Sequence, residues 1–159
     1  MEPWGGFFIA QVGASAALAG LVFVAVSLNL TKILALAHLP KRAFQALTVL
    51  MEILVVSSLA LVPQALPWFG GEALLISLPI WIAVIVLDEQ TLVSAGKEYR
   101  RRSVQRMVIS QAAALLFVVG AIAILAFGLA GVYWLVPAII CSYLIALLDA
   151  WVLLIEINR

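Results

Sequence analysis

The chain carries little charge and few of the residues that build catalytic or metal sites. Of its 159 residues, 11% are charged, and it has one cysteine, Cys141, and one histidine, His38. A lone cysteine excludes an internal disulfide framework and a cysteine-based metal site, and a lone histidine excludes histidine clusters. No glycine-rich phosphate loop and no histidine-paired nucleophile is present. We therefore expect neither an enzyme nor a bound cofactor or metal.

Apolar residues make up most of the chain instead. They amount to 66% of the sequence, whereas soluble domains are about half apolar. A soluble domain of this size could not bury so much apolar surface in one core. The first residues include Glu2 and no basic residue, which is unlike a secretory signal, so we expect the first apolar run to be retained as a span. The composition predicts an all-α polytopic membrane protein.

The uncharged runs predict five transmembrane helices. A helix needs about 20 apolar residues to cross the ~30 Å hydrocarbon core. Residues 107–148 carry no charge, and as one helix they would be about 63 Å long. A turn at Gly128–Gly131 is therefore expected to divide them into two spans. The prediction is a single transmembrane domain, residues 1–159, with spans at about 7–30, 43–62, 73–92, 107–128 and 132–155.

All nine basic residues fall on one side of this topology. They lie in segment 31–42, in segment 93–106 and at Arg159. By the positive-inside rule the N-terminus is outside and the C-terminus cytoplasmic. The basic residues of segment 93–106 are expected to hold the topology and to bind anionic lipid headgroups rather than nucleic acid. They are Lys97, Arg100, Arg101, Arg102 and Arg106.

The first predicted span carries small residues at helical spacing. Gly13 with Ala17, and Ala16 with Gly20, form small-xxx-small pairs. Such pairs let two helices approach closely in a membrane, where packing replaces the hydrophobic driving force. Two interpretations remain open. The pairs either pack inside a compact bundle or form the seam of a homo-oligomer.

Ionisable groups at bilayer depth are candidate functional residues because they are costly to bury. Glu52 is ten residues past Arg42, and Asp149 is ten residues before Arg159. Each carboxylate should therefore lie about 15 Å from the cytoplasmic face. Further polar residues are expected to accompany them in the cytoplasmic half, around a hydrated vestibule with the two carboxylates at its floor. They are Gln45, Thr48, Asp88, Gln111, Ser142 and Asn29.

These polar residues have three possible roles. They could form the pathway of a cation, or relay protons. They could also be structural, with one carboxyl group protonated and hydrogen-bonded or paired with Arg106 or Lys32. Asp88 is placed near the inner boundary, where it would meet water or loop arginines. The leading hypothesis is a small oligomeric channel- or transporter-like protein. The alternative is a non-catalytic adaptor or modulator of another membrane protein.

Three segments, residues 13–30, 39–43 and 61–64, resemble small uncharacterised bacterial membrane proteins. Some of these are labelled modulators of an FtsH-type membrane protease. The resemblance covers about residues 5–65 and consists mainly of small and apolar positions. It implies the bacterial cytoplasmic (inner) membrane, and it carries no established activity. A membrane protease is the kind of partner that it implies for an adaptor.

Overall fold

The computed structural model describes residues 2–35, 39–94 and 100–154, and this part of the chain is helical with no strand. The all-α prediction is confirmed. Short helices are η1 (Glu2–Trp4), α2 (Leu30–Ala35) and η2 (Gly128–Trp134). The long helices are α1 (Gly5–Leu28), α3 (Leu39–Leu61), α4 (Leu66–Ser94), α5 (Arg100–Phe127) and α6 (Leu135–Leu154).

Four stretches of the described chain are long and apolar enough to cross a membrane. They are Gly5–Leu28, Leu39–Leu61, Leu66–Gln90 and Val104–Leu154, the last of which contains most of α5, all of η2 and α6. The outer surface suits lipid, since Leu28, Trp68 and Leu75 are each nearly three-quarters exposed (74%, 73% and 75%). Large apolar side chains are exposed along all five long helices, whereas soluble monomers rarely expose large contiguous apolar surface. The bundle is consistent with an integral membrane protein.

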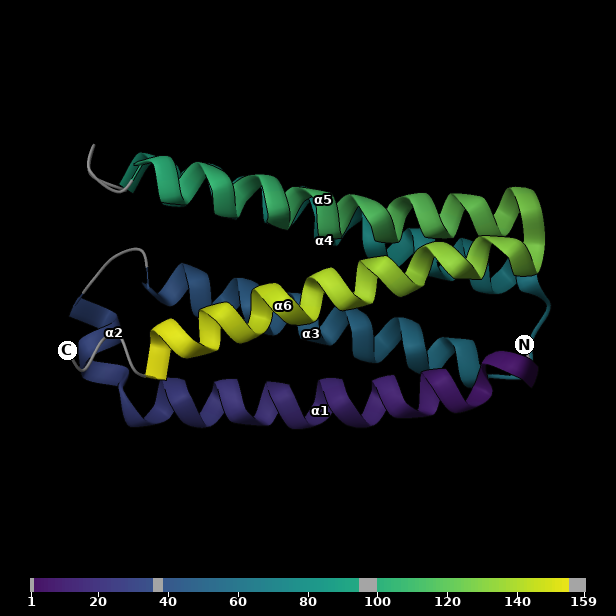
Figure 1. Cartoon of the computed structure of the whole chain (residues 1–159), viewed down its shortest axis with the longest axis horizontal. Helices are drawn as coiled ribbons and strands as arrows, with labels where there is room; N and C mark the ends of the chain where they lie inside the picture. The colour runs from purple at the N-terminus through teal and green to yellow at the C-terminus, as the bar shows by residue number, and fades with distance from the viewer. Residues whose placement is uncertain (1, 36–38, 95–99, 155–159) are drawn as a thin grey trace.

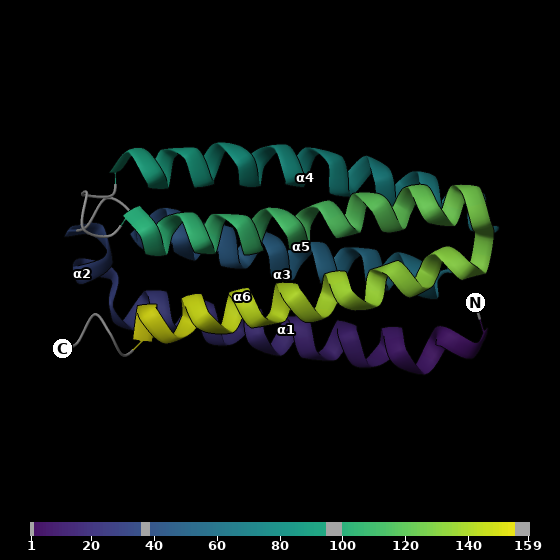
Figure 2. The same cartoon turned by 45° about the horizontal axis from the view of Figure 1, so that its top comes forward.

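The long helices lie side by side and alternate in direction (Figures 1 and 2). The α4–α5 hairpin forms one side of the bundle, and α1, α3 and α6 form the other. The end of the bundle where α1, α4 and α6 finish is called the basic end here. Its described basic residues are Lys32 in α2, Lys41 and Arg42 at the start of α3, and Arg106 near the start of α5.

Aromatic rings gather at the opposite end, called the aromatic end. The rings of Trp4 and Tyr133 meet edge to face with centroids 4.8 Å apart, and those of Phe8 and Phe69 are 6.5 Å apart. Edge-to-face pairs of this kind add to the stabilisation that burial gives. These contacts tie the start of the chain to η2 and α4.

Two helices begin earlier than the predicted spans. α4 begins at Leu66 rather than near residue 73, and α5 begins at Arg100 rather than near residue 107. α4 begins in apolar sequence, residues 66–71, which Glu72 separates from the predicted span, and the backbone hydrogen bonding of α5 continues past its apolar stretch into polar residues 100–106. As a result Arg106 is part of α5 and not of a loop. The expected break is present, because Gly128 adopts a positive φ of 62° and a 3-10 turn follows it.

The helices approach most closely near the aromatic end. A Cβ atom built on Gly131 would lie 2.3 Å from the carbonyl carbon of Ala123 and the nitrogen of Ile124. A Cβ atom on Gly120 would lie 2.7 Å from a methyl group of Leu135. At Gly131 the neighbours are backbone atoms that cannot move aside, so only a residue without a side chain fits there. This contact fixes η2 and the start of α6 against α5.

The small residues of α1 point away from the bundle. Gly13, Ala16, Ala17 and Gly20 are all exposed, and a Cβ atom on either glycine would meet nothing within 4 Å. α1 packs against its neighbours through another face, which buries Phe8, Ser15, Val22 and Ala25. The interpretation that the small pairs pack inside this bundle is therefore wrong, because α1 is rotated so that these four residues face outward.

Candidate functional site

Arg106 and Asp149 form the strongest polar contact in the described structure. Arg106 Nε donates to Asp149 Oδ1 at 2.9 Å, and Arg106 Nη2 donates to the second oxygen of the same carboxylate. The side chains are 14% and 1% exposed. Arg42 Nε of α3 lies 3.5 Å from Asp149 Oδ1. A two-pronged, charge-assisted contact of this kind fixes geometry as well as charge.

Gln45 connects this pair to the α4–α5 hairpin. Its Nε2 donates to Asp88 Oδ1 at 3.0 Å and to Ser110 Oγ at 2.6 Å. Its Oε1 accepts a hydrogen bond from Arg106 Nη2 at 3.1 Å. Both ends of this buried amide are thus used, and side chains from α3, α4 and α5 meet at it.

Asp88 lies inside the bundle and not at the water boundary where the sequence places it. The residue is 2% exposed, and Gln111 Nε2 donates to its Oδ2 at 2.8 Å. Arg106 Nη1 is 3.8 Å from Asp88 Oδ1. Gln111 Oε1 in turn accepts from Trp81 Nε1 at 3.0 Å. The sequence did not predict this burial, because the side of α4 that faces the bundle interior continues past its uncharged stretch, residues 73–87.

We refer to these side chains as the polar network. It joins α3, α4, α5 and α6 near the basic end and contains two arginines and two aspartates, so its formal charge is balanced. A buried charge is tolerated when it is paired and hydrogen-bonded. The members are Arg42, Gln45, Trp81, Asp88, Arg106, Ser110, Gln111 and Asp149.

Glu52 is not part of this network. It lies on α3 seven positions beyond Gln45 and is 1% exposed, yet neither carboxyl oxygen has a hydrogen-bond partner among the described residues. The hydroxyl of Ser77 on α4 lies near the Glu52 carboxyl group. The two groups do not form a hydrogen bond of normal geometry. The hydroxyl of Ser57 is likewise buried without a partner. Among the described residues, Glu52 is a buried acidic group whose two oxygens lack hydrogen-bond partners.

The prediction that the two carboxylates lie at one depth is wrong. Arg106 Nη2 contacts both Asp149 and Gln45, whereas Glu52 lies seven positions, about 10 Å, further along α3. Asp149 is neutralised by Arg106 and Arg42, which is the structural alternative that the sequence left open. Glu52 has no such partner. Helix rise gives depth only relative to the residue from which it is counted, and Arg42 and Arg159 do not mark one common depth. The rotation of each helix about its axis then decides which groups meet.

The other candidates occupy separate positions. Thr48 is half-buried and donates to the Phe44 carbonyl of its own helix. Asn29 Nδ2 donates to the Leu153 carbonyl at 3.2 Å and so ties the end of α1 to α6. Ser142 is buried in α6. The hydrogen bonds described for Thr48 and Asn29 thus go to backbone carbonyl groups rather than to Glu52 or Asp88.

The basic cluster is divided by the structure. The sequence groups Arg106 with the residues that bind lipid headgroups, but its guanidinium lies inside the bundle against Asp149 and Gln45. Lys97 lies outside the described residues, as do the side chains of Arg100, Arg101 and Arg102. The inward position of Arg106 has a sequence signal, since Ser110 follows four residues later and shares its helical face.

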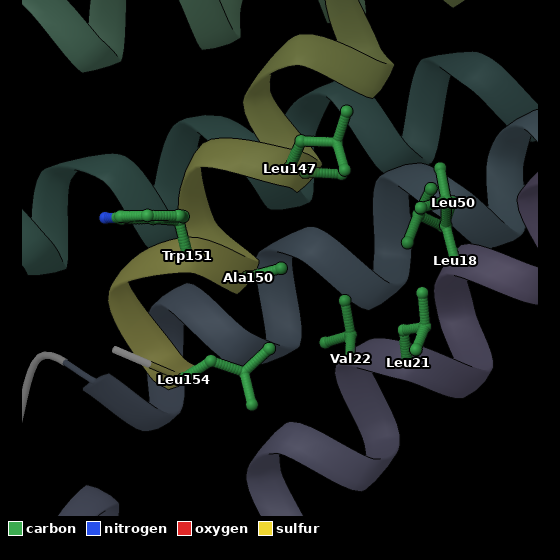
Figure 3. A pocket seen from close by; sticks show the side chains of 9 residues that line it. Leu18, Leu21, Val22, Leu50, Leu147, Ala150, Trp151 and Leu154 are labelled. Atoms are coloured by element: carbon green, nitrogen blue, oxygen red, sulfur yellow. The ribbon is translucent and has the colours of Figure 1, made fainter. Parts of the chain in front are cut away.

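An apolar groove lies elsewhere on the bundle. It has a volume of about 200 Å³ and runs between α1 and α6, with Leu50 of α3 at its base (Figure 3). Leu18, Val22, Leu147 and Trp151 are among the side chains that line it. Glu52 and Asp149 do not, so this groove is not the hydrated vestibule that the sequence predicted. No group of three or more His, Cys, Asp or Glu residues that could hold a metal ion occurs in the described ranges.

Comparisons with protein-family models, with curated proteins and with solved structures gave no match to this chain. The site is therefore interpreted from its own geometry.

Proposed function

We propose that the protein is a small ion-transporting membrane protein in which Glu52 binds a proton or a cation that arrives from the basic end. The proposal includes five spans, with α5 and α6 crossing separately, a cytoplasmic basic end in a bacterial inner membrane and assembly as a homo-oligomer. Of the basic residues outside the polar network, Lys97 and Arg100–Arg102 would contact anionic headgroups. No catalytic step is proposed.

The observation that carries this proposal is the unsatisfied carboxyl group of Glu52. A buried polar group without a partner costs free energy, and an ionised carboxylate costs far more than a neutral one. A group with no structural partner is therefore poorly explained as a stabilising residue. Taking up a proton or a cation would neutralise it where it stands, and such residues in membrane helices commonly mark ion pathways.

The polar network supplies the approach to Glu52. Gln45 and Glu52 are seven positions apart on one face of α3, which corresponds to about 10 Å along the helix. The carboxylates of Asp88 and Asp149 lie on the basic-end side of Glu52 and are held in place by Arg106. In this proposal they position the network and Glu52 alone is the binding group.

Flux through reconstituted protein tests the proposal. Proteoliposomes would carry a pH-sensitive dye or a dye for monovalent cations, and a membrane potential would drive uptake. Glu52→Gln keeps the size of the side chain and removes its charge, so flux should fall to the level of empty liposomes. Thr48→Val is the matched control, because Thr48 bonds only within α3, and it should leave flux unchanged. Equal leak in wild-type, Glu52→Gln and empty liposomes would exclude ion transport.

The exposed small face of α1 favours a second candidate, a non-catalytic adaptor that docks on another membrane protein such as a membrane protease. Gly13 and Gly20 leave open space for a neighbouring helix, and small residues permit close contact between membrane helices. Crosslinking in native membranes separates the candidates. A stoichiometric second protein crosslinked through α1 favours the adaptor, and a ring of identical chains favours the transporter.

A further inference from the structure

We propose that the ion that Glu52 binds is a proton rather than a metal cation, and that Ser77 of α4 is the positioning residue that exchanges a hydrogen bond with its carboxyl group. This inference rests on the proposed role of Glu52 as the binding group and names the species that it binds. Three features support it: the free hydroxyl group beside Glu52, the small number of oxygen atoms there, and the apolar side chains around it.

The hydroxyl group of Ser77 differs from several others in these helices. Ser15, Ser27 and Ser58 each donate to the backbone carbonyl four positions earlier, which is a common way for a helical serine to satisfy its hydroxyl. Ser77 is 1% exposed, and its Oγ has no hydrogen-bond partner in the described structure. It lies near the Glu52 carboxyl group instead. The Ser77 hydroxyl is thus a buried polar group that is available to Glu52.

A serine hydroxyl can serve a carboxyl group in both protonation states, because it donates one hydrogen bond and also accepts. When Glu52 is ionised, the Ser77 O–H donates to a carboxylate oxygen. When Glu52 takes a proton from a hydronium ion, which leaves as water, the new O–H of Glu52 donates to Ser77 Oγ. Ser77 keeps its own proton throughout. One carboxyl oxygen stays without a partner in either state, so Glu52 remains costly to bury.

A metal cation would need more oxygen atoms than this pair offers. Ca²⁺ takes about six to eight oxygen ligands and Mg²⁺ takes an octahedral set, and potassium channels replace the hydration shell of the ion with rings of carbonyl oxygens. The pair supplies the carboxyl oxygens of Glu52 and the hydroxyl of Ser77. A proton needs only one of these oxygens.

Other oxygen atoms on α3 and α4 lie on other faces of these helices. Ser57 is also buried without a partner, but it is five positions from Glu52 and therefore rotated by about 140° around α3. Pro79 frees the carbonyl of Leu75, four positions earlier, from its helical hydrogen bond. Leu75 is 75% exposed, so this carbonyl lies on the outer face of α4 and away from Ser77.

A buried apolar cluster separates Glu52 from the polar network. Val49 precedes Glu52 by three positions on α3. Val84 lies between Ser77 and Asp88 on α4. A metal ion that came from the network would lose its water at this apolar cluster, whereas a proton passes from one water molecule to the next and carries no hydration shell. The members are Val49, Val84 and Ala114, with Ile80 and Trp81 packed against them.

The other titratable groups on the helices around α3 do not neutralise Glu52. α1 carries none. Asp88 and Asp149 are held by Arg106, and Arg42 lies ten positions before Glu52, about 15 Å along α3. No side chain in the described structure is hydrogen-bonded to the Glu52 carboxyl oxygens. The remaining groups of this kind on α2, α3, α4 and α6 are Lys32, Lys41, Glu72, Glu89, Cys141 and Tyr143.

Infrared difference spectroscopy tests the proton assignment, because a carboxylic acid and a carboxylate have separate carbonyl bands. The sample is the full wild-type chain in lipid vesicles, and Glu52→Gln, which keeps the size of the side chain, identifies the band of Glu52. The carboxylic acid band should be present in choline chloride and unchanged when Na⁺, K⁺ or Li⁺ replaces choline. Loss of the band on adding one of these cations would overturn the proposal. So would the absence of the band at every pH at which the protein stays folded.

Ser77→Ala and Ser58→Ala form a matched pair for the role of Ser77, since the Ser58 hydroxyl bonds within α3. A carboxylic acid that loses a hydrogen bond absorbs at a higher frequency. Ser77→Ala should therefore shift the Glu52 band to higher frequency, and Ser58→Ala should leave it in place. An unshifted band in Ser77→Ala would remove Ser77 from the proposal. The cation titration uses the wild-type chain, so it decides between proton and metal whatever these variants do.

Flux separates this inference from the proposed function. Proton uptake in choline medium should equal that in Na⁺ or K⁺ medium, and dyes for Na⁺ and K⁺ should report no more uptake than in empty liposomes. Uptake of Na⁺ or K⁺ that Glu52→Gln abolishes would overturn the proton assignment and leave ion transport standing. If the acid band of Glu52 is present but no ion enters faster than in empty liposomes, transport fails and proton binding stands.

Discussion

Arg106 and Asp149 are joined through both oxygens of the carboxylate, across two antiparallel helices and 43 positions of sequence. This ion pair is the centre of the polar network, since Arg106 also contacts Gln45 and approaches Asp88. The sequence alone groups Arg106 with the arginines that face lipid headgroups. The ion pair shows that Arg106 instead joins helices inside the bundle.

Removing one member of this pair should destabilise the protein strongly. In Asp149→Ala, Arg106 keeps only a distant carboxylate, Asp88 at 3.8 Å, and a buried charge left without its partner costs about 3–5 kcal/mol. We expect a loss of about 3 kcal/mol in the free energy of unfolding, measured by SDS titration in mixed micelles with circular dichroism. A loss below about 0.5 kcal/mol, the range of ordinary surface changes, would show that water already surrounds the pair.

Much of the fold was predictable because it depends on hydropathy and on one glycine. The apolar runs predict the long helices, and Gly128 breaks the longest run because its positive φ is accessible to glycine. The starting points of α4 and α5 were not predictable from apolar content. α4 begins before Glu72, which interrupts its apolar sequence, and α5 extends into polar sequence, which carries Arg106 into the bundle.

The site was predictable as a set of residues but not as a set of contacts. Glu52, Asp88, Asp149, Gln45 and Gln111 all stand out in sequence as polar residues within apolar runs. Whether Asp149 faces Arg106 or Glu52 depends on how each helix is rotated about its axis. That rotation is set by the packing of all neighbouring helices, which a single helical periodicity does not determine.

Replacing Glu52 by an apolar residue should stabilise the protein. Glu52→Leu removes a buried carboxyl group that has no hydrogen-bond partner in the described structure, and its surroundings on α3 include the buried side chains of Ile53 and Val56. Such a group costs about 1–3 kcal/mol when unsatisfied. We expect a gain of about 1 kcal/mol or more in the same micelle titration.

A matched comparison sharpens this prediction. Asp149→Leu replaces another buried carboxylate, one that is fully paired, and should lower the free energy of unfolding. Opposite signs for the two leucine variants distinguish an unsatisfied group from a satisfied one. A destabilised Glu52→Leu would mean that Glu52 has a partner, and its assignment as the binding group would be withdrawn.

Gln45 should matter more to stability than its neighbour Thr48. In Gln45→Leu, each of Asp88, Ser110 and Arg106 loses one hydrogen-bond partner. Thr48→Val removes only a hydrogen bond within α3. The unsatisfied groups should cost about 1–3 kcal/mol in Gln45→Leu, against a change near zero in Thr48→Val. Equal effects of the two variants would argue that the network is hydrated and contributes little.

Two glycine-to-alanine variants should have opposite consequences. At Gly131 the new methyl group would lie 2.3 Å from backbone atoms of Ala123 and Ile124, which cannot rotate away, so α5 and η2 must separate. Overpacking of this kind typically costs about 1–3 kcal/mol. At Gly13 the methyl group meets open space, and alanine favours a helix over glycine by about 0.5–1 kcal/mol. Micelle titration of both variants should therefore give a clear loss for Gly131→Ala and no loss for Gly13→Ala. A tolerated Gly131→Ala would mean that η2 and α5 pack more loosely than their contacts indicate.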